Sequence, residues 1–310
     1  MRRCLESLRV AFRGREHEVV VVVNGHDRET TDHLISAGVQ HYLLPKSTPG
    51  AARNLGMEKT KGEWICFLDD DVEVPENYFD QAFGFIEQND TACIFGGPDM
   101  PPTDANPWGR ALGYTLSSPL ATAKTRFRHT TLLLNSPTEG HESKLILCNL
   151  WIKRSLLQRH NLRFDDAFFR NEENVLLYHL RQYRQYYLPH LYVWHNRNTG
   201  FWPVCRATAM SGRMRMQSFI LFPRSTELIY FVPAIFIALN LLLLPFMGLF
   251  PLLFYVIMVS VFAAIWSCQR KELSLWWRVA LYHVVINFAY GLGFLFAAPL
   301  FFWQKIRRDQ

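Results

Sequence analysis

The chain has 310 residues and a formal net charge of +6, and its length allows one large domain or two ordinary ones. Its hydrophobic residues are unevenly spread: residues 1–226 mix charged and apolar side chains, whereas residues 228–303 are nearly free of charge. Because the basic residues concentrate in residues 197–224 and around the apolar runs, the charge indicates anionic membrane lipid as a partner and argues against nucleic acid.

The first residues and the cysteines indicate a reducing compartment. Residues 1–9 carry charges where the apolar core of a cleavable export signal should run, so we expect the N-terminal part to stay in the cytosol. The cysteines show no C-x-x-C spacing, which predicts neither a zinc site nor a disulfide framework. We therefore expect reduced and mostly buried thiols at Cys4, Cys66, Cys93, Cys148, Cys205 and Cys268.

The first half of the chain alternates between the two periodicities of regular structure. Strands are predicted at residues 18–23, 41–44 and 64–68, and helices at residues 28–38, 50–60 and 77–89. This alternation predicts an α/β sheet whose ligand site lies beyond the carboxyl ends of the strands.

Three carboxylates, Asp69, Asp70 and Asp71, stand at the end of one predicted strand. Adjacent carboxylates repel each other unless a cation or hydrogen bonds offset the charge, so we expect a hard divalent ion, Mg²⁺ or Mn²⁺, here. A helix-capping acidic turn before Pro75 is the alternative. His195 is a further candidate for a metal or phosphate contact, against a purely structural role.

Two stretches nearby carry a family resemblance. Residues 50–56 read G-A-A-R-N-L-G, and residues 61–71 read K-G-E-W-I-C-F-L-D-D-D. Together they resemble the glycosyltransferase family 2 signature, G-x-A-R-N-x-G followed by G-E-x-x-x-F-L-D-x-D. The resemblance implies the GT-A fold, an α/β nucleotide-diphospho-sugar transferase domain with a Rossmann-like mixed sheet.

The same resemblance implies roles for individual residues. Asp69 and Asp71 are expected to hold a metal on the donor diphosphate. Arg53, Asn54 and Asp70 are the expected donor contacts, although an exposed helix face is the commoner place for an arginine.

A second block is similar to the family's acceptor-side motifs G-N-x-x-x-R-R, F-D-E and N-E-D, at residues 148–154, 164–166 and 171–174. Glu173 replaces the usual aspartate of N-E-D, so the general base is expected to be Glu173 or Glu172. One base and direct displacement predict inversion at the anomeric carbon. Asn149 and Trp151 are the acceptor-binding candidates, although tryptophans more often pack in cores.

Further stretches narrow the resemblance. Residues 96–98, 110–120 and 126–128 resemble the succinoglycan-type branch, which contains bacterial exopolysaccharide transferases with membrane tails. The Q-x-x-R-W stretch of processive polymerases does not follow the acceptor motif, so we expect addition of a single sugar.

Two departures from the family concern the nucleobase pocket. The family opens with an apolar strand ending in P-x-Y-N, and nothing before Cys4 supplies it. We therefore expect either a truncated start or an incomplete pocket, with an edge or gap in the sheet. Where the family carries an acid that faces the base, the chain has Val23-Asn24, which leaves Asn24 as a donor-binding candidate.

The C-terminal quarter predicts about three membrane helices, at residues 228–246, 249–267 and 279–303. The first two are expected to form a tight hairpin, and the third either crosses or bends back near residues 287–293, where Gly291 and Gly293 weaken a helix. Buried helices of a soluble core are the alternative. Residues 208–222 suit an interfacial helix or one packed on the soluble domain.

These patterns predict a GT-A domain over residues 1–205 without its first strand, an interfacial segment over 206–226, a membrane domain over 227–304 and a basic tail over 305–310. The expected activity moves a sugar from a nucleotide-diphosphate sugar, UDP-sugar first, to a lipid-linked or polysaccharide acceptor. The expected place is the bacterial inner membrane, with the catalytic domain in the cytoplasm. A soluble acceptor, a catalytically impaired scaffold and a transporter are the alternatives.

Overall fold

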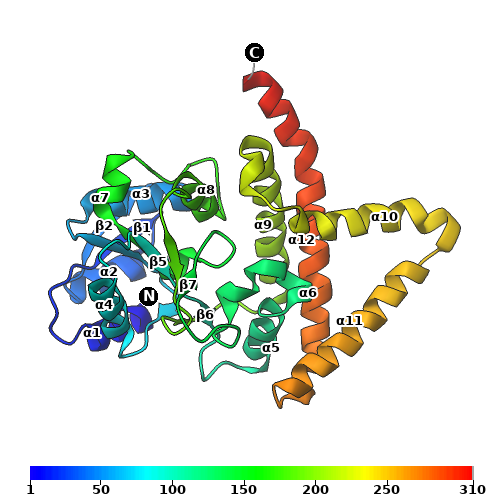
Figure 1. The fold of residues 1–310 in the computed structure, drawn as a ribbon, viewed down its shortest axis with the longest axis horizontal. Coiled ribbons are helices and arrows are strands. Elements are labelled where there is room, and N and C mark those ends of the chain that lie inside the picture. Colours follow the sequence, from blue (N-terminus) through cyan, green and yellow to red (C-terminus); the bar gives the residue numbers. More distant parts are fainter. Residues whose placement is uncertain (309–310) are drawn as a thin grey trace. The chain divides into compact units, whose positions relative to one another are not determined.

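The computed structural model describes residues 1–308, which form two compact units. The sheet unit contains Met1–Met100 and Thr130–His195, and the helical unit contains Pro101–His129 and the chain from Asn196 onward. In Figure 1 the N-terminal blue and cyan elements belong to the sheet unit and the orange and red helices to the helical unit. Residues 101–129 thus belong to the same compact unit as the apolar C-terminal helices.

The sheet unit follows the predicted alternation of strands and helices closely. In chain order it contains α1 (Arg2–Phe12), β1 (Val20–Asn24), α2 (Arg28–Ser36), β2 (Gln40–Leu44), α3 (Pro49–Lys59), β3 (Trp64–Phe67), β4 (Val72–Glu73), α4 (Tyr78–Gln88), β5 (Ile94–Gly96), β6 (Asp99–Met100), β7 (Thr138–Glu139), η2 (Leu147–Asn149), β8 (Leu150–Lys153), α7 (Arg154–Arg159), α8 (Glu172–His179), β9 (Gln185–Tyr187) and β10 (Val193–His195). Each predicted strand and helix of residues 18–89 is present, with ends shifted by at most two residues.

The strands of residues 1–308 form three sheets. The largest is mixed and has the order β3-β8-β5-β9-β7, β1 and β2 form a parallel pair, and β10 lies between β4 and β6. Among the described residues, β1 pairs with β2 alone and β3 with β8 alone. Their starting ends are nevertheless joined, because the Glu18 carboxylate accepts a hydrogen bond from the Gly62 amide at 2.6 Å. The β1-β2 pair and the five-stranded sheet remain separate sheets in the described part of the chain.

An aromatic core supports the large sheet. Phe95 on β5 stacks on Trp151 of β8 with ring centroids 5.3 Å apart, and Phe79 of α4 contacts Trp151 edge-on. Helix α1 adds Leu8 and Phe12 to the same cluster. The N-terminal residues therefore form a helix that is part of the core.

The helical unit contains α5 (Pro107–Leu116), α6 (Pro119–Thr122), η1 (Ala123–His129), α9 (Phe201–Leu221), η3 (Pro223–Ser225), η4 (Leu228–Phe231), α10 (Val232–Met247), α11 (Phe250–Gln269), η5 (Leu273–Leu275) and α12 (Trp276–Arg308). In the part of the chain that the structure describes, three stretches are long and apolar enough to cross a membrane: Leu228–Met247, Phe250–Gln269 and Leu273–Pro299. Their exposed apolar side chains, such as Phe246 at 83%, disfavour the alternative of a buried soluble core.

The expectation of a tight hairpin is wrong, and the structure decides between the two alternatives for the third run. Helices α10 and α11 do not form a tight hairpin but diverge from their connecting turn, as Figure 1 shows. The third run does not bend back, because α12 is one continuous helix. A Cβ on Gly293 would stand 2.0 Å from the Ala209 carbonyl oxygen, and one on Gly291 would stand 2.8 Å from the Pro233 carbonyl oxygen. These glycines therefore admit neighbouring helices at close range, as small residues do in membrane bundles.

Helix α9 extends beyond the segment predicted at residues 208–222 and begins at Phe201. Met214, Met216 and Ile220 are buried, and a Cβ on Gly212 would stand 2.1 Å from the Tyr290 carbonyl oxygen of α12. This helix is therefore packed within the helical unit.

Candidate functional site

The small sheet β4-β10-β6 gathers the candidate metal ligands. Asp71 directly precedes β4, and His195 at the end of β10 is paired with Val72. Asp99 opens β6 opposite Val193. This register brings side chains from three distant parts of the sequence to one place, which sequence spacing alone does not reveal.

His195 lies between two carboxylates. Its Nε2 is 3.2 Å from Asp71 Oδ1, and its Nδ1 is 2.8 Å from Asp99 Oδ2. Asp69, Asp71 and His195 each offer a ligand atom, and these atoms lie within 4.8 Å of one another. Two carboxylates and an imidazole suit Mn²⁺ or Mg²⁺, and the 45% exposure of the Asp71 side chain leaves this face open to a ligand.

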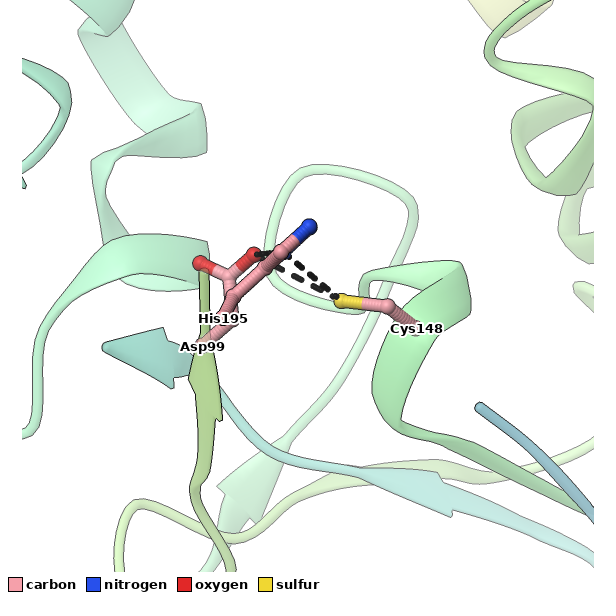
Figure 2. A group of neighbouring side chains, drawn as sticks. All are labelled: Asp99, Cys148 and His195. Carbon is pink, nitrogen blue, oxygen red and sulfur yellow. Dashed lines mark hydrogen bonds and ion pairs between the residues drawn. The ribbon is translucent and has the colours of Figure 1, made fainter. Parts of the chain in front are cut away.

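Asp99 and Cys148 extend the cluster on the buried side of His195, and sequence reasoning missed both. Cys148 Sγ lies 3.5 Å from Asp99 Oδ2 and 3.6 Å from His195 Nδ1, and Figure 2 shows the three side chains converging. The signal that could have identified Asp99 is the preceding Gly96-Gly97-Pro98. A Cβ on Gly97 would stand 1.9 Å from the Leu191 carbonyl oxygen, so glycine there permits this close approach.

Arg53 on α3 joins the carboxylates of two motifs. Its Nη2 donates to Asp69 Oδ1 at 3.0 Å, and its Nη1 donates to Glu172 Oε1. Burial lowers the pKa of the guanidinium, but the carboxylates of Asp69 and Glu172 outweigh that effect and raise it. The Arg53 side chain is 22% exposed and held as a cation, so it is positioned within the site and does not lie on an outer helix face.

Glu172 and Glu173 form the first turn of α8, and both are buried, at 3% and 4% exposure. Burial raises the pKa of the Glu172 carboxyl to about 7; the Arg53 cation opposes this shift and the Glu173 carboxylate adds to it. Two adjacent buried carboxylates beside an arginine are a common arrangement for proton transfer near neutral pH.

The predicted donor contacts Asn24 and Asn54 both form hydrogen bonds with backbone groups. Asn24 donates to the Ser47 carbonyl at 3.0 Å and accepts from the Ser47 amide at 2.8 Å. Asn54 makes the same pair of bonds with the backbone of Phe164, at 2.9 and 2.8 Å. Each amide thus fixes a loop. Asp70 is exposed and stands outside the metal-ligand groups found among the described residues.

The predicted acceptor contacts Asn149 and Trp151 lie in the core, at 0% and 3% exposure. Asn149 donates to the carbonyls of Pro98 and Leu191 and accepts from the Tyr78 hydroxyl, and Trp151 donates to the same hydroxyl at 2.9 Å. Neither side chain can reach an acceptor from this position. In the structure Asn149 links neighbouring segments of the sheet unit. Trp151 packs in the core, as tryptophans more often do.

None of the six cysteines, all within the described residues, takes part in a disulfide. Only Cys4 and Cys148 are buried, so the expectation of mostly buried thiols is wrong.

Comparison with known proteins gives one family match and several distant structural matches. The family described as "Glycosyl transferase family 2" matches residues 1–160. An "Uncharacterized glycosyltransferase" of Rickettsia bellii (strain RML369-C) is 32% identical over 79 residues, which is 24% of this chain and 11% of that protein. The chain therefore spans about a tenth of the length of that curated relative.

Among solved structures, the mannosyltransferase PcManGT from Pyrobaculum calidifontis, in complex with GDP-Man and Mn²⁺, matches with a TM-score of 0.52 and 15% identity. The match covers 97% of this chain and 83% of that one. S. aureus TarS 1–349 in complex with UDP-GlcNAc matches with a TM-score of 0.49 and 14% identity, covering 92% and 86% of the two chains.

Proposed function

Because the chain belongs to glycosyl transferase family 2 and is a glycosyltransferase of the GT-A fold, we propose that it moves a sugar from a nucleoside-diphosphate sugar to a membrane-held acceptor, with inversion at the anomeric carbon. The observation that carries this proposal is the convergence of Asp69, Asp71 and His195 beside Arg53 and the buried pair Glu172 and Glu173. A cation site next to carboxylates suited to proton transfer is what such a reaction needs.

Asp69, Asp71 and His195 Nε2 are the proposed ligands of Mn²⁺ or Mg²⁺. When bound, the cation supplies charge stabilisation to the diphosphate leaving group. Arg53 holds Asp69 in place and keeps positive charge on the same side of the site. PcManGT was solved in complex with Mn²⁺ as well as GDP-Man, which supports testing manganese first.

Glu173 is the proposed general base that takes the proton from the attacking acceptor hydroxyl. One carboxylate oxygen of Glu172 already accepts a hydrogen bond from Arg53, so this side chain is directed toward the guanidinium. We therefore assign Glu172 to positioning Arg53 and Asp69, and Glu173 to proton transfer.

The proposed acceptor is lipid-linked, in the synthesis of a bacterial cell-surface polysaccharide. Three helices with the length and composition of membrane spans support this proposal. Basic residues before the first span and after the second support it as well. We propose an inner-membrane protein with the sheet unit facing the cytoplasm. If the natural acceptor were soluble, transfer to it would be equally fast with and without lipid in the assay.

The experiment is calorimetry of UDP-sugar binding to the full-length protein in detergent, with Mn²⁺ and then with chelator, followed by a transfer assay with lipid-linked and soluble acceptors. We expect Mn²⁺-dependent binding and transfer to the lipid-linked acceptor alone. A parallel titration with GDP-sugar shows whether the donor nucleotide carries uracil or guanine.

A catalytically impaired scaffold is the second candidate, and the separation of β1 from β3 favours it. Absence of Mn²⁺-dependent binding of both UDP-sugar and GDP-sugar would contradict the transferase proposal and support the scaffold.

A further inference from the structure

The buried side of His195 carries a set of side chains that the proposed sugar transfer does not use. Asp99 is 0% exposed and Cys148 1% exposed, and they lie on β6 and η2. Their ligand atoms and His195 Nδ1 fall within 4.8 Å of one another. Figure 2 shows the three side chains converging. A carboxylate, a thiol and an imidazole are the three side-chain groups that most often bind zinc.

The separations between these atoms approach the edges of a tetrahedral zinc site. Bond lengths of about 2.3 Å to sulfur and about 2.1 Å to nitrogen or oxygen give tetrahedral edges of about 3.3 to 3.6 Å. The sulfur of Cys148 lies 3.5 Å from Asp99 Oδ2 and 3.6 Å from His195 Nδ1. The third edge, from Asp99 Oδ2 to His195 Nδ1, is 2.8 Å and needs a small opening to admit a cation.

We propose that Asp99, Cys148 and His195 Nδ1 form a second cation site, which binds a thiophilic divalent ion such as Zn²⁺ and whose occupancy withdraws His195 from Asp69 and Asp71. Thiolate sulfur selects zinc over Mg²⁺ and Mn²⁺, whereas the oxygen-rich group on the other side of the ring favours the hard ions. On binding, Cys148 releases its thiol proton to water and coordinates as the thiolate.

The two sites exclude each other because a neutral imidazole has one nitrogen lone pair to offer. With zinc on Nδ1, the ring proton is on Nε2, where it donates to Asp71 across the 3.2 Å separation. With the donor-side cation on Nε2, the ring proton is on Nδ1 and donates to Asp99. Asp71 thus orients the ring for zinc binding, and Asp99 orients it for the donor-side cation. This exclusion rests on the proposed function, whereas zinc binding itself does not.

The first experiment titrates Co²⁺, a spectroscopic substitute for Zn²⁺, into the full-length protein in detergent. We expect a sulfur-to-cobalt charge-transfer band in the near ultraviolet that equimolar Zn²⁺ removes. Cys148→Ser should abolish the band, and the matched control Cys93→Ser, which changes a half-buried thiol of the same unit, should retain it. Asp99→Asn should weaken Co²⁺ binding by at least about tenfold.

Absence of the band in the wild type, or its persistence in a folded Cys148→Ser or Cys148→Ala variant, would overturn the zinc site. The second experiment measures Mn²⁺ binding by electron paramagnetic resonance with and without Zn²⁺. We expect Zn²⁺ to weaken Mn²⁺ binding in the wild type but not in Cys148→Ser, and equal weakening in both would contradict the exclusion. A cobalt band that requires Cys148, found together with no Mn²⁺ or nucleotide-sugar binding, would contradict the proposed function but support the zinc site.

Discussion

Arg53 Nη2 donates to Asp69 Oδ1 at 3.0 Å, which fixes a carboxylate at the end of β3 from the neighbouring helix α3. The other side of the same guanidinium is bound to Glu172, so one cation joins the acidic loop to the first turn of α8. In the proposed reaction this cation aligns the metal-binding and proton-transfer sides of the site.

Arg53→Lys tests the planar fork of the guanidinium, because a lysine ammonium keeps the charge but cannot bridge two carboxylates in the same way. We expect kcat/KM to fall by about 10- to 100-fold, since a buried charge-assisted hydrogen bond contributes about 1.5 to 3 kcal/mol. The control is Arg163→Lys, whose ion pair with Glu58 is exposed. Equal activities of the two variants would show that bridging is unimportant.

Glu173→Gln and Glu172→Gln separate the proposed base from the positioning residue. Loss of a general base lowers kcat by about 10² to 10⁴-fold. We expect this loss in Glu173→Gln, and a smaller loss in Glu172→Gln accompanied by weaker Mn²⁺ binding. Steady-state kinetics and metal titration give both values. A larger kcat loss in Glu172→Gln would exchange the two roles.

The raised pKa of Glu172 predicts a pH-dependent stability. The folded state keeps a proton that the unfolded state releases between the ordinary value of 4.5 and about 7, so this residue's contribution to stability falls as pH rises through that window. The full effect is about 3 kcal/mol. The Tm of the wild type should therefore drop relative to that of Glu172→Gln between pH 4.5 and 7 and then level off. A constant Tm difference would contradict the raised pKa.

Gly293→Ala tests close helix packing in the helical unit. Its Cβ would stand 2.0 Å from the Ala209 carbonyl oxygen, and such overpacking costs about 1 to 3 kcal/mol. Gly84→Ala on α4 is the matched control, because nothing lies within 4 Å of its added Cβ. Thermal unfolding in detergent should show a lower Tm for Gly293→Ala and an equal or higher Tm for Gly84→Ala. Equal losses would refute the packing argument.

The sequence predicted local structure well because periodicity and turn residues act over short distances. Except for the short strand β4, the strands and helices between Val20 and Gln88 follow from such patterns, as do the metal-ligand candidates Asp69 and Asp71 and the three apolar helices. The pairing of strands that lie far apart in the sequence could not be predicted in this way. Asp99 joins His195 only because β6 and β10 are neighbours in a sheet, and no spacing in the sequence encodes that register.

The same limit applies to residues whose role depends on long-range contacts. Asn54 and Asn149 belong to motifs, but a motif does not say whether a polar side chain faces a ligand or a backbone carbonyl. Gly291 and Gly293 were interpreted by helix propensity, whereas contacts with α9 and α10 decide their role.

The most direct test of the account is Mn²⁺ binding by electron paramagnetic resonance in the presence of UDP and GDP, comparing the wild type with Asp71→Asn and Asp70→Asn. The two variants remove neighbouring charges, but only Asp71 belongs to the cluster with His195. We predict that Asp71→Asn abolishes saturable binding and sugar transfer, while Asp70→Asn keeps the bound manganese signal. Unchanged manganese binding and transfer in Asp71→Asn would contradict the central claim.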